Sequence, residues 1–239
     1  MEAVTGVLLL HGVRTSRTMW RAQVGALEAA GHRALAVDLP GHGERRGERF
    51  TLEAADRTVH EGVRALGPGP VVVVGLSLGG YVALHALAQD ASGVGALVAA
   101  GCCTPPARAV LHAWSLLVRG IVSLPDGGAT LNRRFAELVL SPQAVADLAA
   151  GGFALDVMED VLRELGEVRP LVHLAALDLP VWLVNGRWDH FRLFERSYVR
   201  AGRDVRLRVV PRARHLVSLD QPVAFTRLVL EAVESLERR

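Results

Sequence analysis

Short apolar runs alternate with helix-like stretches along most of the chain. Six runs have the length of a buried strand, and we interpret them as continuous apolar segments rather than alternating ones: 7–10, 34–37, 71–74, 96–99, 181–184 and 207–210. Such segments are typical of a parallel sheet that is covered by helices on both faces. Helical patterns at 20–30, 51–66, 81–88 and 224–236 lie between or after them. We therefore predict an α/β fold with a mostly parallel sheet of about six strands and right-handed crossovers.

One interval breaks this alternation. Between residues 104 and 178 no strand is predicted, and helical patterns cover 108–122, 132–140, 142–150 and 155–165. These roughly 75 residues are far more than a crossover needs. We predict a helical cap at 104–178, inserted into an α/β core formed by 1–103 and 179–239. Its apolar residues, among them Phe153 and Met158, are expected to pack internally more often than to contact a substrate.

Composition narrows the class of protein. The 239 residues are enough for one large domain with an insertion, and the net charge is only +2 although all 27 basic residues are arginine. No basic stretch is interleaved with aromatic residues, so we expect no nucleic-acid partner. No apolar run approaches roughly 18 residues, so we expect no membrane span. The N-terminus carries Glu2 and lacks a basic region and a cleavage pattern, which predicts no signal peptide and a cytoplasmic protein.

The two cysteines are Cys102 and Cys103. Because adjacent cysteines form a disulfide only with strain, we expect two ordinary thiols. No histidine and cysteine cluster has the spacing of metal ligands, so we predict neither a metal nor a cofactor. The sequence leaves the oligomeric state open.

The most informative motif is Gly75-Leu76-Ser77-Leu78-Gly79, which follows the third predicted strand and opens a helical stretch. A serine between glycines at this place is the sequence form of a sharp turn that holds the hydroxyl out at the edge of the sheet. Glycines are needed on both sides because a Cβ there would collide with the neighbouring strand or helix. The motif makes Ser77 a candidate nucleophile.

A serine needs a base and an orienting acid to become a strong nucleophile. Asp189 follows the fifth predicted strand, and His215 follows the sixth. Functional loops of a parallel sheet leave the carboxyl ends of its strands, so Ser77, Asp189 and His215 are predicted to meet at one edge. His190 lies beside Asp189 with poor geometry for reaching Ser77, and we expect a structural role for it.

The first predicted strand ends in His11-Gly12-Val13, where the glycine allows the backbone to turn its amides toward the serine. We expect the N–H groups of Val13 and Leu78 to form an oxyanion hole. His11 comes too early in the chain to serve as the base and is predicted to stabilise the loop through a hydrogen bond.

These landmarks resemble the α/β-hydrolase superfamily along nearly the whole chain. The matching segments are His11-Gly12, Trp20, Asp38-Leu39-Pro40-Gly41-His42-Gly43, Gly75-Leu76-Ser77-Leu78-Gly79-Gly80, Gly186-Arg187-Trp188-Asp189 and His215. The resemblance implies a serine-nucleophile, esterase-like branch. In it Ser77 is the nucleophile, His215 the base and Asp189 the orienting acid, with the oxyanion hole at the Val13 and Leu78 amides. The short N-terminus, in which the first two strands usual in the family are missing, is similar to the methylesterase and hydroxynitrile lyase group.

The serine also selects the chemistry. Dehalogenases and epoxide hydrolases of this family need a carboxylate nucleophile, so Ser77 argues against both. We predict an enzyme that hydrolyses a carboxylic ester, thioester or lactone through an acyl-enzyme, with water activated at His215. The expected substrate is a small apolar ester or acyl compound under the cap, and its candidate contacts are Trp114, Tyr81 and Trp188.

Several alternatives use the same three residues. They are carbon–carbon bond hydrolysis, hydroxynitrile-type lyase chemistry, perhydrolysis and cyclisation of natural-product intermediates. A ligand receptor on a hydrolase scaffold is an alternative of a different class. Turnover separates the classes, because a receptor would bind its ligand without multiple turnovers.

Overall fold

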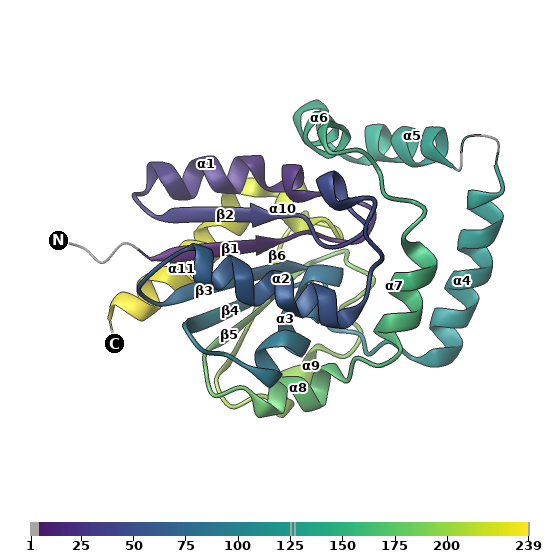
Figure 1. Cartoon of the computed structure of the whole chain (residues 1–239). Helices are drawn as coiled ribbons and strands as arrows, with labels where there is room; N and C mark the ends of the chain where they lie inside the picture. The colour runs from purple at the N-terminus through teal and green to yellow at the C-terminus, as the bar shows by residue number, and fades with distance from the viewer. Residues whose placement is uncertain (1–4, 125, 127, 239) are drawn as a thin grey trace.

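A parallel sheet of six strands forms the centre of the molecule (Figure 1). The computed structural model describes residues 5–238 except 125 and 127. The sheet order is β2-β1-β3-β4-β5-β6, and every neighbouring pair is parallel. The strands are β1 (Gly6–Leu10), β2 (Arg33–Val37), β3 (Val71–Leu76), β4 (Val94–Ala100), β5 (Val181–Gly186) and β6 (Val205–Val210). The predicted α/β fold is confirmed.

Helices cover both faces of this sheet. Strand residues alternate between the two faces, so Leu8 and Leu10 belong to one apolar cluster and Leu9 to the other. The first face is covered by α2 (Leu52–Ala65), α3 (Leu78–Gln89), α8 (Pro170–Ala176) and α9 (Glu195–Ala201). The second is covered by α1 (Arg21–Ala29), α10 (Val217–Asp220) and α11 (Pro222–Glu237). Two short 3₁₀ helices, η1 (Arg17–Trp20) and η2 (Gly43–Arg45), lie in the loops after β1 and β2.

Four helices between β4 and β5 lie beyond the ends of the strands (Figure 1). They are α4 (Arg108–Val122), α5 (Ala129–Val139), α6 (Pro142–Ala150) and α7 (Met158–Leu165). Helix α8, at the end of the predicted 104–178 segment, packs instead against α3 and α9, and its Leu174 belongs to the apolar cluster of the first face. Residues 1–4 and 239 of the predicted core, and 125 and 127 of the predicted cap, lie outside the described residues.

The edge strand β6 differs from the continuous apolar segment that the sequence predicts. Arg206 and Arg208 alternate with apolar residues along it, and its first five positions are only partly buried. The Arg206 guanidinium lies 4.3 Å from the centre of the Trp182 ring, and Arg208 pairs with Glu231 of α11 at 2.6 Å. An edge strand has a neighbour on one side only and is partly exposed, so polar side chains fit on it.

The sequence does not predict helices α8 and α9. Pro170, which the sequence pattern treats as a helix breaker, stands in the first turn of α8.

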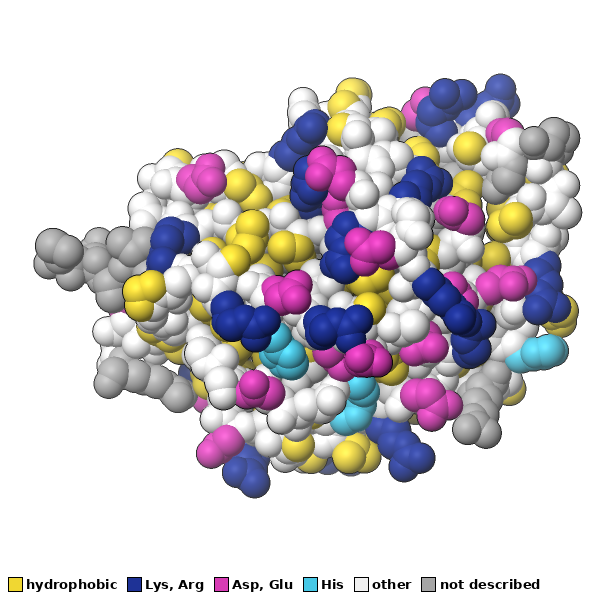
Figure 2. Space-filling view, in the orientation of Figure 1, with side chains coloured by type: hydrophobic (Ala, Val, Ile, Leu, Met, Phe, Trp, Pro, Cys, Tyr) yellow, Lys and Arg dark blue, Asp and Glu magenta, His cyan; other side chains and the backbone are white. Residues whose placement is uncertain are grey.

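The surface carries charges of both signs. On the face shown in Figure 2, arginine and acidic side chains are interspersed rather than gathered by sign. Among the described helices, none combines the length and the apolar character that crossing a bilayer requires.

The packing of β1 generates a stability prediction. Leu9 is fully buried in the centre of the sheet, and Leu9→Ala should lower the free energy of unfolding by about 2–5 kcal/mol because it leaves a cavity. Leu138, which is 82% exposed, supplies the control: Leu138→Ala should change the free energy of unfolding by less than about 0.5 kcal/mol. Urea unfolding of both variants measures the difference. Equal effects would contradict the buried position of β1.

Candidate active site

The turn from β3 into α3 holds Ser77 in an unusual backbone conformation. Its φ is 54° and its ψ is −113°, a region that residues with a side chain rarely occupy. The flanking glycines make this turn possible. A Cβ on Gly75 would lie 2.3 Å from the carbonyl oxygen of Gly79, and a Cβ on Gly79 would lie 2.3 Å from that of Leu10. The Ser77 N–H donates to the Ala100 carbonyl at 2.7 Å, which ties the turn to β4.

His215 bridges the other two predicted residues. Its Nε2 lies 3.0 Å from the Ser77 hydroxyl oxygen, and its Nδ1 lies 3.0 Å from Oδ1 of Asp189. A carboxylate can only accept, so Nδ1 carries the proton and Nε2 is left to accept from the serine hydroxyl. The structure thus brings together three residues that are far apart in the sequence, each from a loop or turn that follows a strand. This arrangement can move a proton away from the serine oxygen.

Asp189 is nearly inaccessible and is held by two donors. Besides His215, the backbone N–H of Phe191 donates to Oδ1 at 2.8 Å. Burial by itself raises the pKa of the Asp189 carboxyl, but the hydrogen bond and charge of His215 and the Phe191 amide lower it more, so its pKa lies below the usual value. The carboxylate is therefore ionised at neutral pH and can orient the imidazole.

The two backbone amides that the sequence predicts for an oxyanion hole are both free to donate. Within the part of the chain that the structure describes, the N–H groups of Val13 and Leu78 have no hydrogen-bond acceptor. The β1 loop lies against the serine: a Cβ placed on Gly12 would be in ordinary van der Waals contact with Ser77 Cβ, at 3.6 Å. Free donors on both sides of a serine can bind the oxygen of a tetrahedral intermediate.

His11 stabilises this loop. The ring is fully buried, its Nε2 accepts from the Leu39 N–H at 3.0 Å, and its Nδ1 lies 2.8 Å from the Gly12 carbonyl. Burial, followed by the neighbouring His42 ring, lowers the pKa of His11 to about 3. The ring is therefore neutral and has the structural surroundings that the sequence predicts for it.

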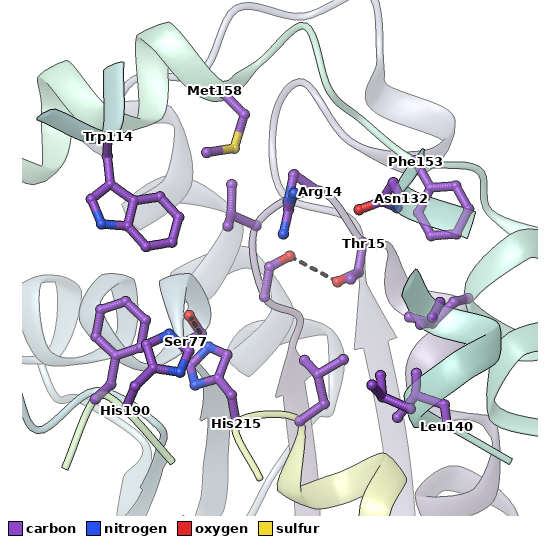
Figure 3. Close-up of a pocket in the computed structure, with 17 residues that line it drawn as sticks. Arg14, Thr15, Ser77, Trp114, Asn132, Leu140, Phe153, Met158, His190 and His215 are labelled. Carbon is purple, nitrogen blue, oxygen red and sulfur yellow. Dashed lines mark hydrogen bonds between the residues drawn. The ribbon is translucent and has the colours of Figure 1, made fainter. Parts of the chain in front are cut away.

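Two cavities adjoin Ser77. The larger has a volume of about 220 Å³, and His215 is among the residues that border it (Figure 3). The smaller has about 90 Å³ and is almost entirely apolar. Five residues border both of them: Val13, Ser77, Trp114, Met158 and Phe191. The serine therefore lies between two spaces, as the two halves of an ester require.

The predicted substrate contacts have different outcomes. Trp114 borders both cavities, and Tyr81 borders the smaller one while its hydroxyl donates to the Thr104 carbonyl. Trp188 borders neither cavity and is 71% exposed, so its position contradicts the predicted contact. The physical reason is the turn after β5: the Trp188 N–H donates to Ala213, and the turn directs Asp189 inward and Trp188 into solvent.

Several residues at the cavities were not predicted. Phe153 and Met158, expected to pack internally, border the larger cavity, and so does His190. Others that the sequence analysis did not single out are Arg14, Thr15, Asn132, Phe191 and Leu216. Four of these five lie within two residues of a predicted site residue, which was a usable signal; Asn132 had none.

The histidines near Asp189 raise the question of a metal. Ligand atoms of Asp189, His190 and His215 lie within 4.8 Å of one another, which a metal ion could use. The Oδ1 atom of Asp189 and both ring nitrogens of His215 already take part in the hydrogen bonds to each other and to Ser77. Binding an ion through these atoms would break that chain of hydrogen bonds.

The thiols of the two cysteines are free and buried. Burial is the main cause that raises the pKa of Cys103 to about 12, and it also raises that of Cys102. Both sulfurs are therefore protonated at neutral pH and are poor nucleophiles, as ordinary thiols are.

Comparisons with known proteins agree with this architecture. Residues 7–228 match the model of the alpha/beta hydrolase family. The chain is 31% identical to esterase Rv0045c of Mycobacterium tuberculosis, over 93% of this chain and 80% of that protein. It is 29% identical to a pimeloyl-[acyl-carrier protein] methyl ester esterase of Neisseria meningitidis serogroup B, over 98% of this chain and 94% of that protein.

Among solved structures, a thermophilic esterase from Thermogutta terrifontis aligns with a TM-score of 0.78, at 22% identity, over 98% of this chain and 91% of that one. At this identity the likeness establishes the fold alone. The family match and the M. tuberculosis relative go further, because each spans most of the chain. The protein belongs to the alpha/beta hydrolase family and is an esterase-like enzyme of that family.

Proposed function

We propose that the protein hydrolyses a carboxylic ester, with Ser77 as nucleophile, His215 as base and Asp189 as orienting acid. The observation that carries the proposal is the position of His215, which lies 3.0 Å from both the Ser77 hydroxyl and the Asp189 carboxylate. The names of the two curated relatives, both esterases, support ester hydrolysis. Thioesters and lactones remain within the same chemistry.

The reaction has two steps. His215 takes the Ser77 proton as the serine oxygen attacks the ester carbonyl carbon, and then gives that proton to the departing alcohol, which leaves an acyl-serine. A water molecule next loses its proton to His215 and attacks the acyl-serine, and the carboxylic acid leaves as the proton returns to Ser77. The charge on the carbonyl oxygen in both steps is stabilised by the Val13 and Leu78 amides. Each such donor contributes about 2.7–4 kcal/mol.

The two cavities give the ester an orientation. The alcohol must leave on the side of His215, which protonates it, and His215 borders only the larger cavity. Leu78 borders only the smaller one. The acyl group therefore occupies the smaller, apolar cavity, and the alcohol occupies the larger. The segment 104–178 acts as a cap in this proposal, since Trp114 and Met158 contribute to both spaces.

The nucleophile is tested by covalent labelling. Wild-type protein should react with a fluorophosphonate probe at one site and turn over p-nitrophenyl acetate many times. Ser77→Ala should lose the label and lower the rate by about 10³-fold or more, because the acyl-enzyme cannot form. Ser123→Ala, at an exposed serine, is the control. Intact mass spectrometry and ester kinetics measure both; a Ser77→Ala variant with full activity would refute the proposal. Labelling without turnover would favour lyase or cyclase chemistry.

The orienting acid is tested by Asp189→Asn. An amide at this position can present its N–H₂ to His215 and stabilise the wrong tautomer, so kcat should fall by about 10³–10⁴-fold while the fold is kept. Asp178→Asn, at a carboxylate that is 87% exposed, should retain the rate. Steady-state kinetics and the melting temperature of both variants provide the readout. An active and stable Asp189→Asn variant would remove Asp189 from the mechanism.

The smaller cavity predicts a preference for short acyl groups. A volume of about 90 Å³ accommodates roughly three water-sized groups, so acetate and butyrate esters should fit and longer chains should not. We expect kcat/KM for p-nitrophenyl decanoate to be at least about tenfold below that for the butyrate. A series of p-nitrophenyl esters measures the trend. A rate that rises steadily with chain length would reverse the orientation assigned to the two cavities.

A further inference from the structure

Among the described residues that border the larger cavity, Arg14 carries the one permanent charge, and none is an aspartate or a glutamate. The other titratable groups in its lining are His190 and His215. Burial, together with the neighbouring His215, lowers the pKa of His190, so its ring is neutral at neutral pH. Arg14 thus gives an otherwise mostly apolar cavity one positive charge.

Arg14 has no counter-ion among the residues that the structure describes. Among the described residues its side chain takes part in no ion pair, hydrogen bond or cation–π contact. Burial is the one cause that lowers its pKa, and no carboxylate acts in the opposite direction. A guanidinium keeps its charge at neutral pH in spite of such a shift. A partly buried and unpaired cation is unfavourable until an anion enters the cavity.

The backbone holds this side chain in place at a cost. Arg14 has a φ of 65°, one of three non-glycine residues among those described with a positive φ. Its carbonyl accepts from the Ala154 N–H at 3.2 Å, and the adjacent Thr15 hydroxyl donates to the Gly12 carbonyl at 2.8 Å. Strained residues of this kind are often found at binding and catalytic sites. Figure 3 shows Arg14 between Trp114 and Asn132, among the residues that border the cavity.

Asn132 adds a neutral polar group. Its side chain is partly buried at the same cavity and has no hydrogen-bond partner among the described residues. A planar guanidinium binds a carboxylate through two parallel N–H···O bonds, and an amide can donate one more. One positive charge matches the single charge of a carboxylate better than the two charges of a phosphate monoester.

We infer that Arg14 forms a carboxylate-binding subsite, so that the substrate class is an ester whose alcohol part carries a carboxylate. This inference rests on the proposed function, which assigns the alcohol to the larger cavity. The acyl part stays apolar in the smaller cavity. Arg14 is thereby a specificity residue, and it takes no part in the movement of protons.

The test uses two esters with the same acyl group and different charge. They are 4-acetoxybenzoate, whose leaving group carries a carboxylate, and 4-acetoxybenzamide, whose leaving group is neutral. We expect wild-type kcat/KM to be at least tenfold higher for the benzoate. Arg14→Gln should reduce this ratio at least tenfold, mainly through KM of the benzoate, and Arg14→Lys should retain part of it. Arg57→Gln removes an exposed arginine of α2 and should leave the ratio unchanged.

The outcomes separate the two proposals. If the benzoate-to-benzamide ratio of kcat/KM is near one in the wild type, or persists in Arg14→Gln, the carboxylate subsite is overturned. Ser77-dependent turnover of both esters would still support the proposed hydrolase. If neither ester is hydrolysed and Ser77 is not labelled, the proposed function fails. Calorimetry with 4-hydroxybenzoate and 4-hydroxybenzamide then tests the subsite directly: tighter binding of the benzoate that is lost in Arg14→Gln supports it, and equal binding overturns it. The melting temperature of each Arg14 variant verifies its fold.

Discussion

The close approach of three backbone segments around Ser77 is the constraint on which the rest of the site depends. β1, β3 and the first turn of α3 come so near one another that Gly75 and Gly79 have no room for a Cβ. The serine between them has a positive φ, a conformation that costs about 1–3 kcal/mol. The surrounding sheet holds this geometry, since the Ser77 N–H is hydrogen-bonded to β4 and the Gly79 N–H to His11. The hydroxyl and the Leu78 amide are oriented together as a result.

The same edge of the sheet supplies the remaining parts. β5 and β6 are in parallel register up to Gly186 and Val210, so the loops that carry Asp189 and His215 begin side by side. The proposed acid and base therefore need no long-range flexibility to meet the serine. Helices α4 and α7 extend beyond this edge (Figure 1) and contribute Trp114 and Met158 to the walls around the serine. The sheet thus sets the chemistry, and the helical segment shapes the space in which the chemistry takes place.

Arg14 connects these two parts of the molecule. It follows the proposed oxyanion-hole residue Val13, and its carbonyl is bonded to Ala154 in the segment between α6 and α7. In the proposed subsite, a charge in this position would act on the alcohol half of the ester without taking part in proton transfer.

The sequence by itself determined which strands precede the candidate site residues, the sharp turn at Ser77 with its flanking glycines, and the class of chemistry. These features are local: a strand ending in Gly75-Leu76-Ser77-Leu78-Gly79 dictates its own turn, and parallel strands bring their carboxyl ends to one edge. Only the tertiary structure decided which side chains border the cavities. Trp188 points outward in a turn whose backbone is hydrogen-bonded to Ala213, and Arg14 borders a cavity to which the described residues contribute no carboxylate. Periodicity and motifs report on neighbours along the chain, whereas the walls of a cavity are assembled from segments that meet only when the chain is folded.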